Sequence, residues 1–397
     1  MATKKNTQLH LAPPVDEEEL IIKKRYRKRQ QKKTMIVAAA LILFIVTGTY
    51  LLLSFQQYTN VSTIKTYTNA GSDNNSYLTF ASGIIRYTSD GVVFLNKSNV
   101  VLWNQPYQIQ SPMIEATEKS FAIADQGGTS ILVFTKDGLK GEIKTSQTIE
   151  KIALSEQGIV SAILKDSKEP KVISYDATGN ILVEHDIDIS ATGYPIGVSM
   201  SPDGNLLGVS YLSIQNNVLT DRIIYYNFGT VGQDKANKAV MTAEYTNTIM
   251  PTMYFMNQDT SVIVGDDRFI INSGSQIPEE KKVIELKKEI KSTFHTDRYI
   301  GFVLKNTEST NYELRVYNAA GREVMSTDFS GEYSNVKIFG REVVMYEGSR
   351  ACIYGLNGIQ KFRGRLTLDA QDIIPVFGIN KYLLINANET QIVRLVK

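Results

Sequence analysis

The chain has 397 residues, of which 43% are hydrophobic and 21% charged, with a formal net charge of +2. That balance excludes a disordered or collagen-like chain and leaves ample apolar material for a folded core. The single cysteine, Cys352, excludes a disulfide framework and a metal site built from several cysteines, and three histidines leave little room for a histidine-rich metal centre.

The charge is unevenly distributed along the chain. Residues 1–33 contain ten Lys/Arg and four Asp/Glu, residues 34–59 contain no charged side chain, and residues 60–397 contain the other 33 Lys/Arg and 37 Asp/Glu. The larger part of the molecule is therefore mildly acidic and has no basic run of the kind that binds nucleic acid. We expect no nucleic acid partner.

The N-terminal region is predicted to be disordered over residues 1–12 and helical from about Asp16, which has Glu19 three positions later as in a helix cap. Residues 35–55 are uncharged, and a helix of that length crosses a hydrocarbon core of ~30 Å. A buried core helix and a cleaved signal peptide are the alternatives to an uncleaved signal anchor. Tyr50, Phe55 and Tyr58 are placed as an interfacial aromatic belt would be.

A basic cluster directly before this stretch sets the expected orientation. Its members are Lys23, Lys24, Arg25, Arg27, Lys28, Arg29, Lys32 and Lys33. Basic flanks stay in the cytoplasm and lie against anionic lipid, so residues 60–397 are expected outside; partner or nucleic acid binding by the cluster is the minor alternative. The predicted organisation is a cytoplasmic basic tail (1–34), a transmembrane signal-anchor helix (35–55) and an extracellular domain (60–397) in a single-pass cell-membrane protein.

The region after residue 60 repeats a short motif in which a large apolar residue precedes a glycine or asparagine by four positions. The pairs are Leu95/Asn99, Phe134/Gly138, Tyr175/Gly179, Tyr225/Gly229, Ile270/Gly274, Tyr317/Gly321 and Tyr354/Gly358. Glycine and asparagine accept the positive φ of a tight hairpin. The pairs recur every 37–50 residues, which is the period of a β-propeller with four short strands in each blade.

The two ends of the repeat region decide the number of blades. The last unit lacks its fourth strand, and the strand Val61–Thr68 precedes the first complete unit. Pairing this strand with Thr390–Lys397 predicts an all-β, eight-bladed β-propeller closed by an N-terminal strand. Seven blades are the alternative if two units merge around residues 240–290, because residues 279–291 fit a helix as well as a strand.

Two motifs carry a resemblance to known propellers. Ser201–Gly204 (SPDG) resembles a hairpin of WD-type and TolB-like propellers, and the Tyr-x-x-x-Gly hairpins resemble the quinoprotein-like group. The recurring Trp-Asp pair of WD repeats is absent, since Trp103 is the only tryptophan. In layout the whole chain resembles a bacterial family of single-span, membrane-anchored extracellular propellers of unknown function. That resemblance implies a Gram-positive-type cell surface and no assigned activity.

Few residues suggest chemistry, and no catalytic, cofactor-binding or metal-binding residue is predicted. His295, two residues from Asp297, could serve as a base, but a hydrogen-bonded strand-end histidine is the simpler interpretation. Asp266 and Asp267 could bind a cation or form an ordinary turn beside an arginine. Cys352 lies in an alternating strand pattern and is expected to be a buried, inert thiol.

The longer loops are the candidate interaction surface. In a propeller, the loops between the second and third strands commonly meet ligands, and two of these are long and polar here: residues 213–221 and 305–311. The candidate residues are Tyr211, Gln215, Asn216, Asn217, Asp221, Lys305, Asn306, Glu308 and Tyr312.

Three functions remain open. The preferred one is a binding or scaffolding domain of the bacterial cell envelope that contacts other envelope proteins or wall polymers. The alternatives are an envelope enzyme acting on glycan or peptide in the propeller funnel, and a single-span sensor of an external ligand. Three or more convergent ionisable groups in the funnel, with His295 or Asp266 among them, would favour the enzyme.

Overall fold

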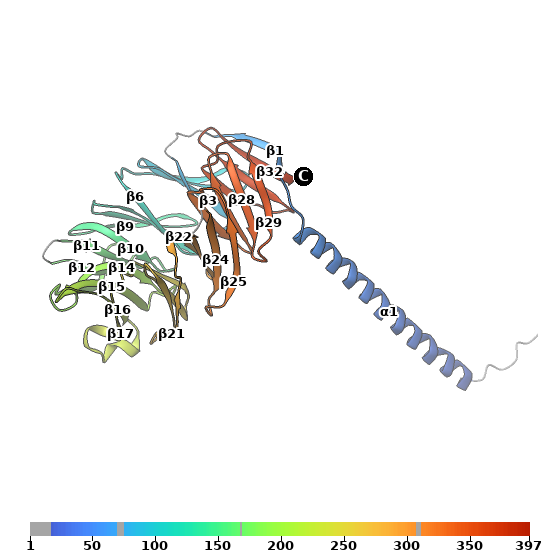
Figure 1. Cartoon of the computed structure of the whole chain (residues 1–397), viewed down its shortest axis with the longest axis horizontal. Helices are drawn as coiled ribbons and strands as arrows, with labels where there is room; N and C mark the ends of the chain where they lie inside the picture. The colour runs from blue at the N-terminus through green and yellow to red at the C-terminus, as the bar shows by residue number, and fades with distance from the viewer. Residues whose placement is uncertain (1–16, 70–74, 167–168, 307–310) are drawn as a thin grey trace, which may run out of the picture. The chain divides into compact units, whose positions relative to one another are not determined.

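The computed structural model describes residues 17–69, 75–166, 169–306 and 311–397, which divide into two compact units, 1–56 and 57–397 (Figure 1). The first unit contains one continuous helix, α1 (Glu17–Ser54), which carries the whole basic cluster and the uncharged stretch as far as Ser54. The expected disorder of residues 1–12 and the expected cap at Asp16 lie outside the described residues.

Helix α1 has the length and apolar composition of a membrane-crossing helix between Lys23 and Thr49, and none of this segment is buried against protein. Met35, Phe44 and Ile45, for example, are 71%, 79% and 56% exposed. The alternative of a buried core helix is therefore wrong. An N-terminal helix with these properties is either a membrane anchor or a signal sequence.

The second unit is an eight-bladed β-propeller in which every blade is a four-stranded antiparallel sheet. Blade 1 consists of β2 (Ser76–Phe80), β3 (Gly83–Tyr87), β4 (Gly91–Asn96) and β5 (Val101–Pro106), and blade 2 of β6 (Pro112–Ala116), β7 (Ser120–Asp125), β8 (Ser130–Thr135) and β9 (Gly138–Lys144). Blade 3 consists of β10 (Thr148–Leu154), β11 (Val160–Lys165), β12 (Lys171–Tyr175) and β13 (Ile181–Asp186), and blade 4 of β14 (Tyr194–Met200), β15 (Leu206–Gln215), β16 (Val218–Asn227) and β17 (Ala239–Thr246).

Blade 5 consists of β18 (Thr252–Asn257), β19 (Thr260–Val264), β20 (Arg268–Ser273) and β21 (Glu279–Glu285), and blade 6 of β22 (Glu289–His295), β23 (Tyr299–Lys305), β24 (Tyr312–Asn318) and β25 (Glu323–Phe329). Blade 7 consists of β26 (Asn335–Phe339), β27 (Glu342–Glu347), β28 (Arg350–Gly355) and β29 (Gln360–Arg365), and blade 8 of β30 (Asp372–Pro375), β31 (Lys381–Ile385), β32 (Glu389–Val396) and β1 (Asn60–Thr68). The first strand of each blade lies at the centre of the propeller. Residues 279–291 form β21 and β22, so the eight-blade prediction is confirmed and the helical alternative is wrong.

The predicted closure is confirmed. β1 pairs antiparallel with β32 from Asn60↔Val396 to Thr68↔Glu389 and supplies the missing strand of blade 8. Tyr58 extends the closure to blade 7, because its backbone N–H donates to the Lys361 carbonyl at 2.9 Å. The expectation that Tyr58 belongs to a membrane belt is wrong: only 7% of this residue is exposed, and it packs in the core between blades 7 and 8.

The predicted hairpin glycines work as expected in most blades. Gly138, Gly179, Gly274, Gly321 and Gly358 have φ between +68° and +140°, and Asn99 has φ +60°. Gly229 does not, with φ −79°, because a short helix, α2 (Thr230–Gln233), and a 3-10 turn, η1 (Ala236–Lys238), replace the tight turn of blade 4. Here the Asn227 side chain accepts a hydrogen bond from the Gly229 N–H, so the polar side chain holds the chain in a wider excursion.

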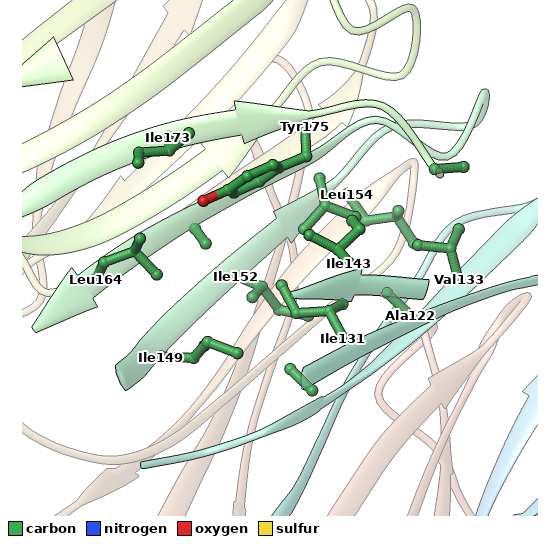
Figure 2. Packing of buried hydrophobic residues seen from close by; sticks show 14 residues of the cluster. Ala122, Ile131, Val133, Ile143, Ile149, Ile152, Leu154, Leu164, Ile173 and Tyr175 are labelled. Atoms are coloured by element: carbon green, nitrogen blue, oxygen red, sulfur yellow. The ribbon is translucent and has the colours of Figure 1, made fainter. Parts of the chain in front are cut away.

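The hydrophobic core consists of layers between neighbouring blades. In one layer Ala122 and Ile131 of blade 2 pack in one cluster with Ile152, Leu164 and Tyr175 of blade 3 (Figure 2). Each fully buried aliphatic side chain in such a layer contributes about 1.5–3 kcal/mol. The blades are thus stable only as a closed set, which holds the two faces of the propeller in a fixed relation.

Candidate binding face and central channel

The antiparallel blades give the propeller two faces. We call the face with the β1 start at Asn60 the proximal face; it carries the turns between first and second and between third and fourth strands. The distal face carries the turns between second and third strands and the connections from one blade to the next. Both predicted interaction loops lie on the distal face.

The first predicted loop, residues 213–221, is not a loop. β15 and β16 continue through it, with Ser213↔Thr220 and Gln215↔Val218 in register. Asn216 and Asn217 alone form the turn, with φ of 50° and 63°, and two such residues in sequence suit the two-residue hairpin turn that matches strand twist. The result is a protruding hairpin that exposes Gln215, Asn216 and Asn217, together with Ile214, which is 71% exposed.

Two of the predicted contact residues are buried and cannot face a partner. Tyr211 has no exposed surface, and its hydroxyl lies 2.9 Å from the Tyr226 hydroxyl. Asp221 is equally buried, and accepts hydrogen bonds from the Ser210 hydroxyl at 2.8 Å and the Met250 N–H at 2.7 Å. The prediction was wrong for both residues because the alternation of side chains along a strand directs these two into the packed interior and not toward solvent.

Burial raises the pKa of Asp221 to about 6, although the hydrogen bonds from Met250 and Ser210 act in the opposite direction. Met250 belongs to the connection from blade 4 to blade 5. Asp221 therefore fixes a distal connection to the base of the hairpin rather than contacting anything outside the protein.

The second predicted loop joins β23 to β24 in blade 6. Lys305 is exposed, Asn306 and Tyr312 are partly buried, and Glu308 lies outside the described residues. The Tyr312 hydroxyl donates to Glu332 at 3.2 Å, and its ring stacks on Phe329. Lys305, Asn306 and Tyr312 therefore stand together on the distal face, as the loop prediction requires.

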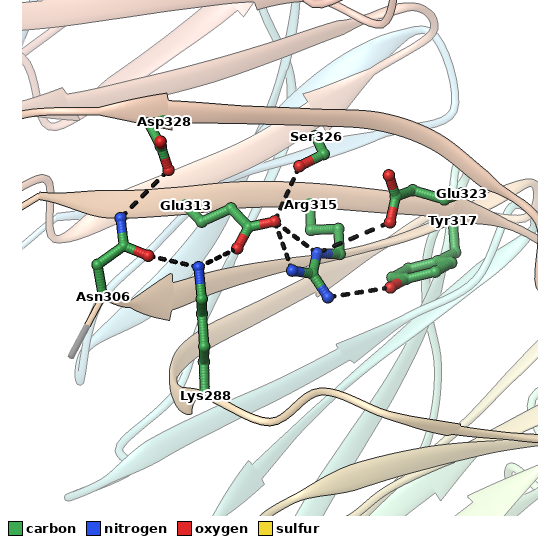
Figure 3. A network of polar contacts seen from close by, with 8 residues as sticks. All are labelled: Lys288, Asn306, Glu313, Arg315, Tyr317, Glu323, Ser326 and Asp328. Carbon is green, nitrogen blue, oxygen red and sulfur yellow. Dashed lines mark hydrogen bonds and ion pairs between the residues drawn. The ribbon is translucent and has the colours of Figure 1, made fainter. Parts of the chain in front are cut away.

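A buried acid that the sequence did not reveal supports this second loop (Figure 3). The Glu313 carboxylate, only 5% exposed as a residue, accepts hydrogen bonds from Lys288 at 2.6 Å, Arg315 at 2.6 Å and Ser326 at 2.8 Å. Lys288 also donates to the Asn306 side-chain oxygen at 2.5 Å. Burial opposes ionisation of Glu313, but the bonds from Lys288, Ser326 and Arg315 outweigh it and lower its pKa.

A cavity of about 1200 Å³ occupies the centre of the propeller, lined by residues of blades 1 to 6. Its mouth on the proximal face is formed by turns between first and second strands, such as those at Thr117 and Thr296. Ionisable side chains converge on it: Glu115, Glu118, Lys151, Glu156, His295 and Asp297. Hydrophobic lining residues such as Met113, Met253 and Phe255 make the walls mixed in character.

The histidine of this channel contacts an aromatic ring. His295 stacks on the Tyr254 ring with centroids 3.7 Å apart, while the Asp297 carboxylate pairs with Arg298 at 3.3 Å. The Tyr254 hydroxyl lies 3.0 Å from that of Thr293. His295 thus lies in the channel as a stacked aromatic side chain, and the Asp297 carboxylate, which could have oriented it as a base, contacts Arg298 instead.

The channel walls favour uncharged side chains. Burial lowers the pKa of His295 to about 4 and raises that of Glu115 to about 7. Both side chains nevertheless reach the channel water, so solvent screening makes these shifts smaller than complete burial in protein would. At neutral pH His295 is uncharged, and Glu115 keeps its proton to a higher pH than an ordinary carboxyl does.

The lysine of the channel is held by main-chain oxygens. Lys151 donates to the Ile196 carbonyl at 2.6 Å and to the Pro251 carbonyl at 3.0 Å, and burial lowers its pKa. The Ile196 carbonyl belongs to blade 4, and the Pro251 carbonyl belongs to the connection from blade 4 to blade 5. Lys151 therefore ties three inner elements together as well as facing the cavity.

The other chemical candidates have structural explanations. Asp266 accepts a hydrogen bond from Thr248 at 2.6 Å, Asp267 makes two 2.7 Å contacts with Arg268, and both lie on the distal β19–β20 turn. Cys352 is buried, which raises its pKa to about 11. Among the described residues, no group of three or more His, Cys, Asp or Glu could hold a metal ion.

Comparison with protein families gives one match over nearly the whole chain: residues 54–395 match the family of unknown function DUF5711. The chain belongs to this family. No curated protein matches the sequence.

Solved structures confirm the fold of this DUF5711 protein. BamB from Moraxella catarrhalis is similar with a TM-score of 0.51 and 10% identity, over 85% of this chain and all of that one. Sqt1 of Saccharomyces cerevisiae is similar with a TM-score of 0.54 and 11% identity, over 86% of this chain and all of that one. Identities this low show a shared propeller fold and nothing about ligands.

Proposed function

We propose that this protein is a membrane-anchored binding or scaffolding protein of the bacterial cell envelope that contacts its partner with the distal face of the propeller. The observation that carries the proposal is the β15–β16 hairpin, which projects Ile214, Gln215, Asn216 and Asn217 from a rigid, closed propeller. A binding residue on a rigid element loses little conformational entropy when it meets a partner. The fold that this chain shares with BamB is compatible with such a role.

The partner suited to this surface is another envelope protein or a wall polymer. Besides the hairpin, the distal face offers Lys305, Asn306 and Tyr312, and amide and phenol groups of this kind make adaptable hydrogen bonds at interfaces. Because the propeller region contains more Asp/Glu than Lys/Arg, nucleic acid is not among the proposed partners. Tyr211 and Asp221 are removed from the contact set because they are buried.

The membrane part of the proposal rests on α1. Eight basic side chains precede its uncharged stretch, and they are expected to keep the N-terminus in the cytoplasm and the propeller outside. The only natural cysteine, Cys352, is buried, so a maleimide should react with a single introduced cysteine and report on which side of the membrane it lies. In wall-stripped cells, a membrane-impermeant maleimide should label Asn217→Cys directly and Gln31→Cys only after the membrane is opened. Labelling in the reverse order would contradict the orientation.

Binding is tested by capture of the full-length protein from solubilised envelopes with quantitative mass spectrometry. Ile214→Asp should remove the specific partner, because it places a charge at the centre of the hairpin contact. Val100→Asp is the matched control, since Val100 is also an exposed apolar residue, at 54%, but lies on the proximal face. Equal capture by Ile214→Asp and the wild type would contradict binding by this hairpin.

A second candidate function is an envelope enzyme acting on glycan or peptide in the channel. It is favoured by the convergence of Glu115, Lys151 and His295 on one cavity. Glu115, with a pKa of about 7, could transfer a proton near neutral pH. The test is release of soluble fragments from purified cell wall by the full-length protein. Glu115→Gln should abolish release and Asp137→Asn, outside the channel, should not; no release by the wild type would contradict this function.

A further inference from the structure

An apolar tip projects from the proximal face of blade 8. The turn between β30 and β31 exposes 97% of Phe377 and 64% of Ile379, with Gly378 between them at φ +119°. Aromatic and branched aliphatic side chains are normally withdrawn from water, so two of them at one turn mark a surface that something covers.

The base of this turn is firmly held. Asn380 donates from its side chain to the Tyr58 hydroxyl at 2.6 Å, and its carbonyl accepts from the Leu395 N–H at 3.0 Å. The Val376 N–H donates to the Lys381 carbonyl at 3.1 Å. The tip is therefore a fixed projection of the closing blade, attached to the first residues of the propeller.

The length of the connecting chain limits how far Tyr58 can lie from the last residue of α1. Tyr58 follows Ser54, the last residue of α1, by four residues. Four extended residues span at most about 14 Å. If α1 crosses the membrane, Tyr58 and the turn bonded to it must lie close to the bilayer surface.

The charges around the turn are of the sign that suits phospholipid headgroups. Arg394 pairs in register with Lys381 at the start of β31, and Lys397 follows at the end of the chain; Arg394 and Lys397 are exposed. The nearby carboxylate of Glu342 is already engaged by Lys361 and by the Tyr382 hydroxyl. An apolar tip with basic neighbours is the usual composition of a segment that enters the lipid interface.

We propose that Phe377 and Ile379 insert into the interfacial region of the bilayer and so fix the propeller with its proximal face toward the membrane. This inference rests on the proposed membrane anchoring by α1. Its consequence is that the distal hairpin points away from the membrane, where an envelope partner can reach it.

The test uses the full-length protein in vesicles of phosphatidylcholine and phosphatidylglycerol, some with acyl chains brominated near the headgroup. Phe377→Trp is compared with Ile214→Trp, since Ile214 is also an exposed apolar residue, at 71%, but lies on the distal face. The wild-type signal of Trp103 is subtracted from both. The inserted tryptophan at 377 should emit at shorter wavelength and lose most of its intensity to bromine, whereas that at 214 should do neither. Ile379→Trp repeats the measurement if the first variant melts at a lower temperature.

The outcomes separate the two proposals. Protein that fails to float with the vesicles contradicts the anchoring by α1. Protein that floats, but whose tryptophan at 377 behaves like that at 214, overturns the insertion alone. A shift to shorter wavelength without bromine quenching also overturns it, because it shows that protein, for example a second copy, covers the tip.

Discussion

The two faces of the propeller are held together by different kinds of polar contact. On the proximal face, acids close turns locally: Asp176 accepts from the N–H groups of Thr178 at 2.8 Å and Asn180 at 3.0 Å. On the distal face, buried acids reach across the chain, as Asp221 does to Met250, 29 residues away. The proximal turn at Asp176 is therefore stabilised by its own sequence, whereas the base of the distal hairpin at Asp221 depends on the connection to the next blade.

Removing the closing strand should have the largest effect, because it separates blades on both faces. A chain beginning at Asn69 lacks β1 and the Tyr58 bridge, and one lacking residues 390–397 loses the buried side chains of Val393 and Leu395. At about 1.5–3 kcal/mol for each buried side chain, plus the lost strand pairing, the loss approaches the ~5–15 kcal/mol stability of a whole domain.

Both truncated chains should therefore aggregate or lack a cooperative thermal transition. A chain beginning at Gln57 should be soluble and melt cooperatively, as measured by circular dichroism. If the chain beginning at Asn69 melts at the same temperature as that beginning at Gln57, β1 does not close the propeller.

The next largest effect is expected from Glu313 on the distal face. Glu313→Ala leaves Lys288 and Arg315 without their shared carboxylate, and breaking a buried ion pair costs up to about 3–5 kcal/mol. Because Lys288 and Arg315 are partly exposed, we expect roughly 2–3 kcal/mol in urea unfolding. The control Glu244→Ala breaks the more exposed pair with Arg222 and should cost under about 1 kcal/mol. Equal losses would contradict the distinction between buried and surface acids.

Asp221, on the distal face, and Asp203, on the proximal face, should respond to pH with opposite signs. The folded-state pKa of Asp221 is raised to about 6, so its stability contribution is present below the ordinary value near 4 and is lost as pH rises through 6. Asp221→Asn removes this loss. The free energy of unfolding of the Asp221→Asn variant, relative to that of the wild type, should rise by on the order of 1–3 kcal/mol between pH 4 and pH 7.

Asp203, in a proximal turn, supplies the opposite case. Burial opposes its ionisation, but hydrogen bonds from Ser201, Asn205 and Gln258 outweigh that effect and lower its pKa. Its contribution is present above pH 4 and lost as the pH falls through the folded-state value, so Asp203→Asn should lose stability relative to wild type as pH rises from 2 to 5. Parallel pH profiles for the two variants would contradict the contrast.

The smallest expected effect concerns a single proximal turn. Gly358 has φ +80°, and open space surrounds the position of a Cβ, so Gly358→Ala tests backbone conformation alone. An alanine in this left-handed region should cost ~1 kcal/mol, and Gly358→Asn should cost less because asparagine tolerates it. Thermal unfolding measures both. No loss for alanine would mean that local turns do not determine the proximal face.

This contrast explains what the sequence could predict. The positive-φ turns follow from signals within a few residues, such as Tyr354 and Gly358. Eight blades and the closure by β1 follow from the regular recurrence of these local signals and from the incomplete unit at the end of the chain. The predicted tight turn at Gly229 was wrong because the Asn227 side chain holds the start of α2 there instead. Tyr58 misled because an aromatic residue just after an apolar helix has the same pattern whether it faces lipid or packs in a core.

The candidate site was only partly predictable for the same reason. Exposure of Gln215, Asn216 and Asn217 follows from a local polar turn, but burial of Tyr211 and Asp221 follows from packing against residues of other strands. In the Glu313 network, Lys288 and Glu313 are 25 positions apart in the sequence, and the stacked Tyr254 and His295 are 41 positions apart. Such residues come together only when the blades assemble. The one local sign of the network in the sequence is the Glu-x-Arg pattern of Glu313 and Arg315 on one strand.

The most direct test of distal-face binding is photo-crosslinking in living cells with the full-length protein. A photoreactive amino acid at Asn216, at the tip of the distal hairpin, is compared with one at Lys97, exposed on a proximal turn. We predict a discrete, reproducible adduct with an envelope partner from position 216 and none of that mass from position 97. An adduct from position 97 alone, or none from position 216, would contradict binding by the distal face.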